Sequence, residues 1–239
     1  MAEADPAASV LAVEDLQAFY GESHILHGVS LEVRRGEVVT LLGRNGSGRT
    51  TTLKAILGLT GRRSGSIRID GQETIDLPTH RIARLGVGYC PEERGIFGTL
   101  DVEENLMLPP TIGADGMSLE AIYEMMPNLA ERRRSMGTRL SGGEQQMLAM
   151  ARILRTGAHL LLLDEITEGL APVIVRTLGE VIERLRGSGY TIVLVEQNFR
   201  FAAPLADRHY IVDRGTIVDM IRREDLDANT AKINEYLSV

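Results

Sequence analysis

The chain has 239 residues, of which 44% are hydrophobic and 25% are charged, enough for one large globular domain or two small ones. Its formal net charge of −7 argues against broad nucleic-acid binding, which depends on phosphate neutralisation by Lys and Arg. The single cysteine excludes an internal disulfide and a cysteine-built metal site, and no apolar run approaches the roughly 18 residues of a membrane span. Because the first residues lack a signal-peptide pattern, we expect a cytosolic protein with a disordered lead-in over about residues 1–9.

The N-terminal part of the chain is expected to be rich in strands. Apolar and β-branched runs alternate there with glycine-containing turns. These runs predict strands at residues 10–13, 29–33, 38–42 and 66–70.

A glycine-rich loop follows the strand at residues 38–42. Residues 43–50 have the spacing of a phosphate-binding loop, G-x-x-x-x-G-[K]-[ST], with Arg49 in place of the lysine. The glycines allow successive N–H groups to curl around phosphate oxygens at the start of the next helix. Thr50 is placed to ligate Mg²⁺ through its hydroxyl. The alternative is a generic glycine-rich turn. The predicted phosphate-binding residues are Gly43, Arg44, Asn45, Gly46, Ser47, Gly48, Arg49, Thr50 and Thr51.

The middle of the chain is predominantly helical. A helix at residues 78–85 and a short strand at 87–90 precede a helical pattern between residues 101 and 134. Methionines in that pattern fill either a core or an adaptable interface. The basic run 132–134 is expected on a solvated helix face. We interpret residues 98–156 as a helical insertion between two parts of one α/β core.

A short motif, Leu140 to Gln146, precedes an apolar helix at residues 147–154. Its serine and glutamate have the spacing of a capping box. The two glycines between them each cost up to ~1 kcal/mol in a helix relative to alanine. A plain cap does not need them, whereas a helix end that approaches phosphate closely does. The predicted phosphate contacts are Ser141, Gly142, Gly143 and Glu144.

Four leucines at residues 160–163 predict a strand that is buried on both faces and ends in Asp164 and Glu165. Ligands of parallel sheets lie at the carboxyl ends of the strands. Asp164 is therefore predicted to hold Mg²⁺, and Glu165 to orient and deprotonate an attacking water. An isolated Asp-Glu pair would instead cap a helix or face solvent. Strand and helix patterns then alternate along the chain, at residues 173–185, 191–195, 199–205 and 208–212. Such alternation indicates an α/β parallel sheet.

These three motifs occur in the order and spacing of the ABC-type ATPases, which the chain resembles over about residues 10–215. The resemblance implies an α/β P-loop NTPase core with a parallel sheet, an N-terminal antiparallel β subdomain and an inserted helical subdomain. All would belong to one nucleotide-binding domain, residues 1–239. Four segments look like the F-type ATPase of branched-chain amino acid uptake, a pattern largely shared by relatives in urea and amide uptake. They are residues 91–97, 99–106, 168–172 and 195–198.

The resemblance implies further site residues. Tyr20 matches the aromatic position that stacks on adenine, although a core or edge-strand tyrosine remains the alternative. Glu92 stands where most family members place a glutamine that touches Mg²⁺ and the attacking water. Gln197 stands at the position of the switch histidine, the γ-phosphate sensor, and the F-type branch often has this glutamine. Residues 93–105 match the region that meets the membrane subunit.

The resemblance also implies ATP and Mg²⁺ as ligands and a set of partners. Two such subunits face each other head to tail, with ATP between the phosphate loop of one and residues 141–143 of the other. The second subunit is either an identical chain or a G-type ATPase. Transmembrane permease subunits and, indirectly, a solute-binding protein complete the assembly, which includes no nucleic acid. The chain would lie in the cytoplasm, peripheral to the inner face of the cell membrane.

Two other functions stay open. ABC ATPases of DNA repair or translation usually carry a long coiled-coil insertion or tandem cassettes with a basic linker, and this sequence has neither. A binding-only subunit would result if Arg49, Glu92 and Gln197 together abolish catalysis. We expect ATP binding with slowed hydrolysis, because arginine keeps the charge but changes its placement. Arg49→Lys should then raise turnover, and a clear drop would mean that the site is built around arginine.

Overall fold

The computed structural model describes residues 9–113 and 116–237. The expected lead-in lies outside these residues except for Ser9, which begins a strand. Among the helices within the described ranges, none has the length and apolar character needed to span a bilayer.

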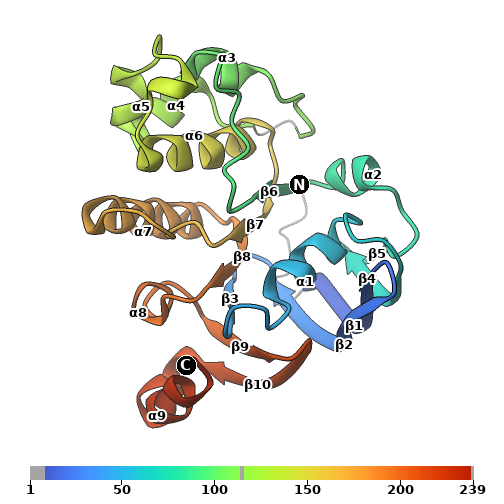
Figure 1. Ribbon diagram of the computed structural model, residues 1–239. Helices are drawn as coiled ribbons and strands as arrows, with labels where there is room; N and C mark the ends of the chain where they lie inside the picture. The colour runs from blue at the N-terminus through green and yellow to red at the C-terminus, as the bar shows by residue number, and fades with distance from the viewer. Residues whose placement is uncertain (1–8, 114–115, 238–239) are drawn as a thin grey trace.

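Two β-sheets form the framework of the molecule (Figure 1). The strands of the smaller sheet are β1 (Ser9–Tyr20), β2 (Ser23–Arg34), β4 (Arg63–Ile69) and β5 (Gln72–Glu73). Those of the larger sheet are β3 (Val38–Leu42), β6 (Val87–Cys90), β7 (Leu160–Asp164), β8 (Thr191–Glu196), β9 (Arg208–Asp213) and β10 (Thr216–Arg222). The smaller sheet is antiparallel in the order β2-β1-β4-β5. The larger has the order β10-β9-β3-β8-β7-β6, parallel except for β10 at its edge.

The central strands of the larger sheet are buried on both faces. In β7, Leu160 and Leu162 pack into the core shared with the antiparallel sheet, whereas Leu161 and Leu163 pack into the core beneath the helices. Both cores depend on the period-2 alternation of a strand, which sends successive side chains to opposite faces. The uninterrupted leucine run therefore folds as predicted.

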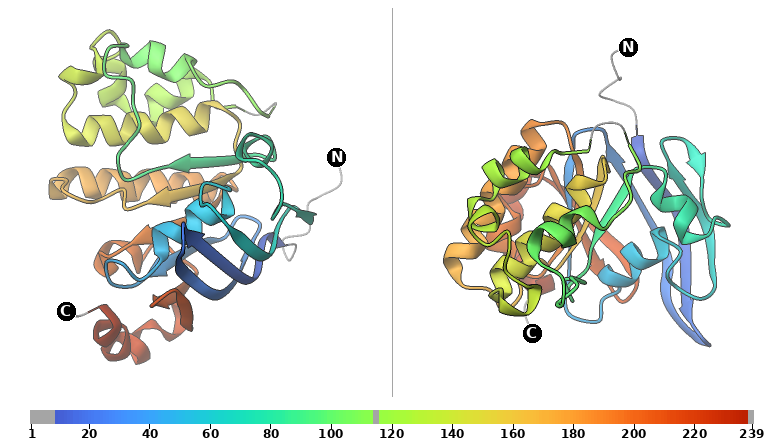
Figure 2. Two further views of the ribbon diagram at one scale, coloured as in Figure 1. Left: turned by 45° about the vertical axis from the view of Figure 1, so that its right-hand side comes forward. Right: turned by 90° about the horizontal axis from the view of Figure 1, so that it is seen from above.

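The helices lie in different parts of the molecule. The short helix α1 (Arg49–Ile56) contributes to the core shared with the antiparallel sheet. Helices α3 to α6 connect β6 to β7 and gather at one end of the molecule (Figures 1 and 2). The helices beyond α1 are α2 (Thr79–Ala83), α3 (Val102–Met107), α4 (Leu119–Met125), α5 (Pro127–Glu131), α6 (Gly142–Arg155), α7 (Pro172–Gly187), α8 (Phe199–Ala202) and α9 (Leu226–Leu237). Short 3-10 turns cover Gly137–Arg139 and Arg223–Asp225. The expected α/β architecture with an antiparallel sheet and inserted helices is confirmed.

The structure differs from the sequence expectations in the extent of its elements. The predicted strands at residues 10–13 and 29–33 belong to twelve-residue strands, because bulges such as the one at Asp15 (φ 49°) let polar residues remain in the ladder. Proline divides the predicted helical stretch, since Pro127 begins α5. The basic run 132–134 lies on an exposed turn after α5, not on a helix face. There Arg132 pairs with Glu144 at 3.3 Å.

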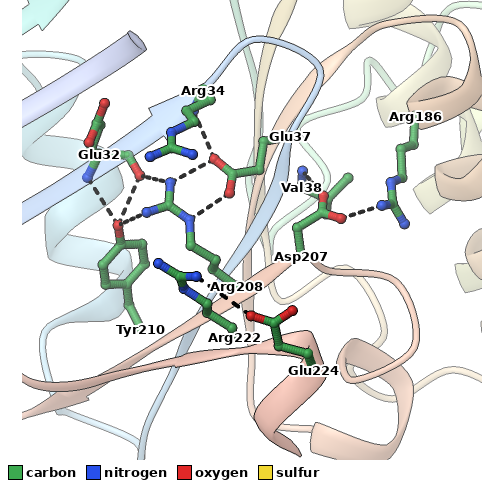
Figure 3. A network of polar contacts seen from close by, with 10 residues as sticks. All are labelled: Glu32, Arg34, Glu37, Val38, Arg186, Asp207, Arg208, Tyr210, Arg222 and Glu224. Carbon is green, nitrogen blue, oxygen red and sulfur yellow. Dashed lines mark hydrogen bonds and ion pairs between the residues drawn. The ribbon is translucent and has the colours of Figure 1, made fainter. Parts of the chain in front are cut away.

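An ion-pair network aligns the amino-terminal ends of β3 and β9 (Figure 3). Arg208 donates through Nε to Oε1 of Glu37 at 2.5 Å and through Nη2 to Oε2 at 2.7 Å. Asp207 accepts from the backbone of Val38 at 3.0 Å and pairs with Arg186. The network lies at the start of β3, whereas residues 43–48 follow the end of β3. It therefore fixes the register of the sheet without touching that loop.

Candidate nucleotide site

The predicted phosphate loop joins β3 to α1. Gly46 and Gly48 have φ angles of +76° and +108°, which residues with a Cβ rarely adopt. Gly43 is required for a different reason, because a Cβ there would lie 2.3 Å from the carbonyl oxygen of Val212. The glycine pattern thus specifies both the turn of the loop and its close approach to β9.

This loop lines a cavity of about 430 Å³ at the carboxyl ends of β3 and β7. The cavity brings together most of the residues predicted to bind nucleotide, although they come from distant parts of the chain. It also includes Ile25 and Glu168, which the sequence analysis did not name. The predicted residues that line it are Tyr20, Asn45, Gly46, Ser47, Gly48, Arg49, Thr50, Thr51, Glu92 and Glu165.

Two polar side chains in this loop each have a buried atom without a hydrogen-bond partner among the described residues. Ser47 and Arg49 are 5% and 3% exposed, and both Oγ of Ser47 and Nη1 of Arg49 lack a partner. The helix that follows has no side-chain cap, since its N-cap residue is Gly48. Unpaired donors at a helix N-terminus are the chemistry of an anion site. The loop is therefore arranged to accept an anionic group.

Arg49 also contacts the predicted general base. Its Nη2 donates to Oε1 of Glu165 at 2.8 Å and to Oδ1 of Asn45 at 3.2 Å. The ion pair is largely buried, with side-chain exposures of 3% and 13%. The guanidinium thus spans the distance between the phosphate loop and the end of β7.

Glu165 belongs to a group of three carboxylates. One ligand oxygen from each of Glu92, Glu165 and Glu168 lies within 4.8 Å of the others. Burial above all, together with a hydrogen bond to Glu168, raises the pKa of Glu165 to about 7, although Arg49 opposes the change. Burial and the neighbouring carboxylates also raise the pKa of Glu92. A carboxylate with a pKa near the operating pH is suited to accept a proton from water.

Asp164 is held by hydroxyl groups on both of its oxygens. Thr50 Oγ1 donates to Oδ1 at 2.9 Å, and Tyr89 Oη donates to Oδ2 at 3.0 Å. Asp164 is 1% exposed, and burial raises its pKa. Mg²⁺ takes oxygen ligands, and the bonded pair of Thr50 and Asp164 offers oxygens of the kind that it prefers. The third predicted ligand, Glu92, lies instead with Glu165 and Glu168.

Sequence reasoning missed Tyr89 and Glu168. Tyr89 lies on β6, which pairs in parallel with β7 and so ends at the same sheet edge as Asp164. That pairing was the signal that could have identified it. Glu168 lies three residues after Glu165, on a turn whose backbone bond joins Glu168 N to Glu165 O at 3.3 Å. No periodic pattern marks such a turn.

Several predicted residues do not line the cavity. Gly43 lies behind the loop, against β9. The guanidinium of Arg44 instead donates to the carbonyls of Glu235 and Tyr236, at 3.0 and 3.1 Å. Gln197 lines a neighbouring cavity of about 300 Å³, which shares Glu165 and Glu168 with the first.

The motif at residues 141–144 forms the N-terminus of α6 and lines neither cavity. Ser141 and Glu144 make the predicted capping box, with bonds of 3.3 and 2.7 Å. The sequence pattern predicts that both glycines allow a close approach to phosphate. The structure gives Gly143 another reason, because a Cβ there would lie 2.7 Å from Ile174 of α7. Helix packing is thus already a reason for a small residue at this position.

Comparisons with known proteins agree with this geometry. A sequence profile of the family described as ABC transporter matches residues 26–168. The chain is 42% identical over 212 residues to a high-affinity branched-chain amino acid transport ATP-binding protein, BraG, of Pseudomonas aeruginosa, covering 87% of this chain and 91% of the relative. It is 37% identical over 216 residues to the lipopolysaccharide export system ATP-binding protein LptB of Escherichia coli K12, covering 88% and 89%.

Solved structures show the same fold. An ATP-binding subunit of an ABC transporter superposes with a TM-score of 0.79 at 29% identity, covering 96% of this chain and 100% of that one. A nucleotide-free ATP-binding cassette superposes with a TM-score of 0.81 at 21% identity, covering 97% and 98%. From the profile, the relatives and the site together, the chain belongs to the ABC transporter family and is one of its ATP-binding, ATP-hydrolysing subunits.

Proposed function

We propose that this chain hydrolyses ATP to energise a membrane importer of branched-chain amino acids. The observation that carries the substrate assignment is the 42% identity to BraG over 91% of that relative. The segment at residues 168–172 and the Glu-Gln-Asn sequence at 196–198 support it, because they resemble the F-type ATPase of such systems. The alternative among importers is that the chain energises the uptake of urea or amides.

Most residues of the cavity have a role in the proposed reaction. Tyr20, which is exposed at the rim, stacks on adenine, and the loop residues that line the cavity, 45–51, hold the phosphates. Glu165 accepts a proton from water as the water oxygen bonds to the γ-phosphorus and the bond to the β–γ bridging oxygen breaks, giving ADP and phosphate. Gln197, beside the same carboxylates, senses the γ-phosphate.

The proposed metal ligands are Thr50, Asp164 and Glu92. Bound there, Mg²⁺ would neutralise charge on the β- and γ-phosphate oxygens. In the described structure the hydroxyl of Tyr89 keeps the carboxylate of Asp164 oriented toward Thr50. The protein thus holds its metal-binding oxygens in place before a ligand arrives.

The signature residues Ser141, Gly142, Gly143 and Glu144 are proposed to act on the ATP of a second subunit. In the described structure they line neither the cavity of the phosphate loop nor that of Gln197, while the phosphate loop retains unpaired donors. A head-to-tail pair would supply both halves to each nucleotide. The second subunit is either an identical chain or a G-type ATPase.

The remaining partners are proposed to be permease subunits and, through them, a solute-binding protein. Residues 93–105 supply the permease contact, and Phe97 in this segment is 47% exposed. The subunit would therefore work in the cytoplasm, at the inner face of the cell membrane. We also propose that residues 1–239 form one nucleotide-binding domain, with residues 98–156 as its helical part.

Two measurements test this function. Phosphate release by the purified chain with ATP and Mg²⁺ separates a hydrolysing subunit from a binding-only one, for which no release is expected. In the organism that encodes the chain, replacement by the Glu165→Gln variant should reduce uptake of radiolabelled leucine at least tenfold. Unchanged leucine uptake would reject the substrate assignment. A defect in urea or amide uptake would assign the chain to that kind of importer instead. A defect in lipopolysaccharide export would assign it to an export system, as the similarity to LptB suggests.

A further inference from the structure

We infer that Arg49 bridges the γ-phosphate of ATP and Glu165, so that this arginine positions the general base as well as binding phosphate. The inference rests on the proposed function and deepens it. It concerns the one position at which the phosphate loop departs from the lysine motif.

One end of the bridge is present in the structure. Nη2 of Arg49 donates to Glu165 at 2.8 Å and to Asn45 at 3.2 Å. Asn45 belongs to the loop and Glu165 follows β7, so a single nitrogen of Arg49 links the loop to a residue 116 positions further along the chain. Because Arg49 is 3% exposed, solvent competes little for this contact.

The other end of the bridge is ready for a ligand. Nη1 of Arg49 is buried and has no hydrogen-bond partner among the described residues. A buried donor without a partner is costly, and a phosphate oxygen would satisfy it. Oγ of Ser47, in the same cavity, is unpaired as well. ATP can therefore gain a contact with Nη1 while the bond from Nη2 to Glu165 remains.

Glu165 requires such a restraint. Its backbone has a φ of 45°, an uncommon conformation for a residue with a side chain. Oxygens of Glu92 and Glu168 lie within 4.8 Å of its carboxylate, and like charges repel. Arg49 is the cation that the structure places against this carboxylate. Its bond to Oε1 fixes one oxygen of the carboxylate relative to the phosphate loop.

Lysine would not reproduce the bridge. A lysine ammonium is a point charge at the end of a flexible stem, whereas the planar guanidinium presents separate nitrogens in a fixed fork. Lysine at position 49 would keep the phosphate contact and lose the hold on Glu165. If Arg49 bridges phosphate and base, Arg49→Lys should lower turnover, which is the outcome that the sequence analysis gave for a site built around arginine.

The test compares the kcat of ATP hydrolysis with the affinity for ATP. For Arg49→Lys we expect kcat to fall at least tenfold, while the Kd for ATP, measured in EDTA so that metal ligation does not contribute, stays within threefold of the parent. Arg186→Lys is the matched control, since Arg186 forms a partly buried ion pair with Asp207 outside the cavity (Figure 3). It should leave both values unchanged. A kcat for Arg49→Lys that is equal to or above that of the parent would overturn the bridge.

A second variant keeps the test informative if Arg49→Lys does not fold. Asn45→Ala removes the loop anchor of Nη2 and retains both charges of the bridge. We expect kcat to fall about threefold with the Kd for ATP again within threefold, and an unchanged kcat would contradict the bridge. If the parent protein binds but does not hydrolyse ATP, the proposed function itself fails. If the parent hydrolyses ATP and both variants match it, only the bridge fails.

Discussion

The helix that begins at Arg49 and the helix that begins at Gly142 both start with glycine-rich turns, but they satisfy their N-termini in opposite ways. Helix α6 has a complete capping box from Ser141 and Glu144, whereas α1 has no side-chain cap. Beside α1 lie the unpaired buried donors of Ser47 and Arg49. One helix end is complete within the chain, and the other requires a ligand. The difference teaches that two glycine-rich helix starts can differ in what the chain itself satisfies: α6 is capped by its own side chains, whereas buried donors beside α1 stay unpaired among the described residues.

The largest expected effect is on the chemistry beside α1. Glu165→Gln should reduce phosphate release roughly 10³-fold, because the amide cannot accept the proton of the attacking water. ATP binding and ATP-driven dimerisation should persist, as size-exclusion chromatography with and without ATP would reveal. Turnover close to that of the parent would remove Glu165 from its role as the base.

The two glycine turns should also differ in their tolerance of a methyl group. Gly43→Ala places a Cβ against the backbone carbonyl of Val212, which cannot move independently, so we expect a loss of about 3 kcal/mol, or roughly 8 °C in Tm. Gly143→Ala meets the side chain of Ile174, which can shift, and alanine favours the helix; we expect a loss of about 1 kcal/mol. Thermal unfolding followed by circular dichroism measures both.

Gly187→Ala is the control for this pair, since nothing lies within 4 Å of a Cβ there. Its Tm should stay within about 2 °C of the parent. If Gly43→Ala and Gly143→Ala prove equally stable, the distinction between a rigid and an adaptable neighbour is wrong.

The smallest effect concerns the two serines. Ser141→Ala removes the N-cap of α6 and should cost about 1 kcal/mol in the free energy of unfolding. Ser47→Ala removes a buried hydroxyl that has no partner among the described residues, so its unfolding free energy should change by less than about 0.5 kcal/mol. Urea titration without nucleotide gives both values, and a repeat with ATP should reveal a loss of binding for Ser47→Ala. A greater loss of stability at Ser47 than at Ser141 would contradict the proposed contrast between the helix ends.

The sequence predicted the residues that belong to local motifs better than the contacts between distant segments. Gly43 to Thr51, Asp164 and Glu165 are defined by strand ends and a glycine pattern, and most of them meet in one cavity. The bond between Arg49 and Glu165, and that between Tyr89 and Asp164, join segments 116 and 75 residues apart. Contacts of this kind depend on how the strands are ordered in the sheet, which spacing along the chain does not specify. For the same reason, the packing of Gly143 on α7 was not foreseen.

The bonds from Arg44 to the carbonyls of Glu235 and Tyr236 affect how the protein should be handled. They tie the end of α9 to the residue that follows Gly43, at the entrance to the nucleotide loop. An affinity tag fused after Val239 would begin only a few residues from this attachment and would report on, or disturb, the ATP site. For kinetic work a tag is better placed at the other terminus.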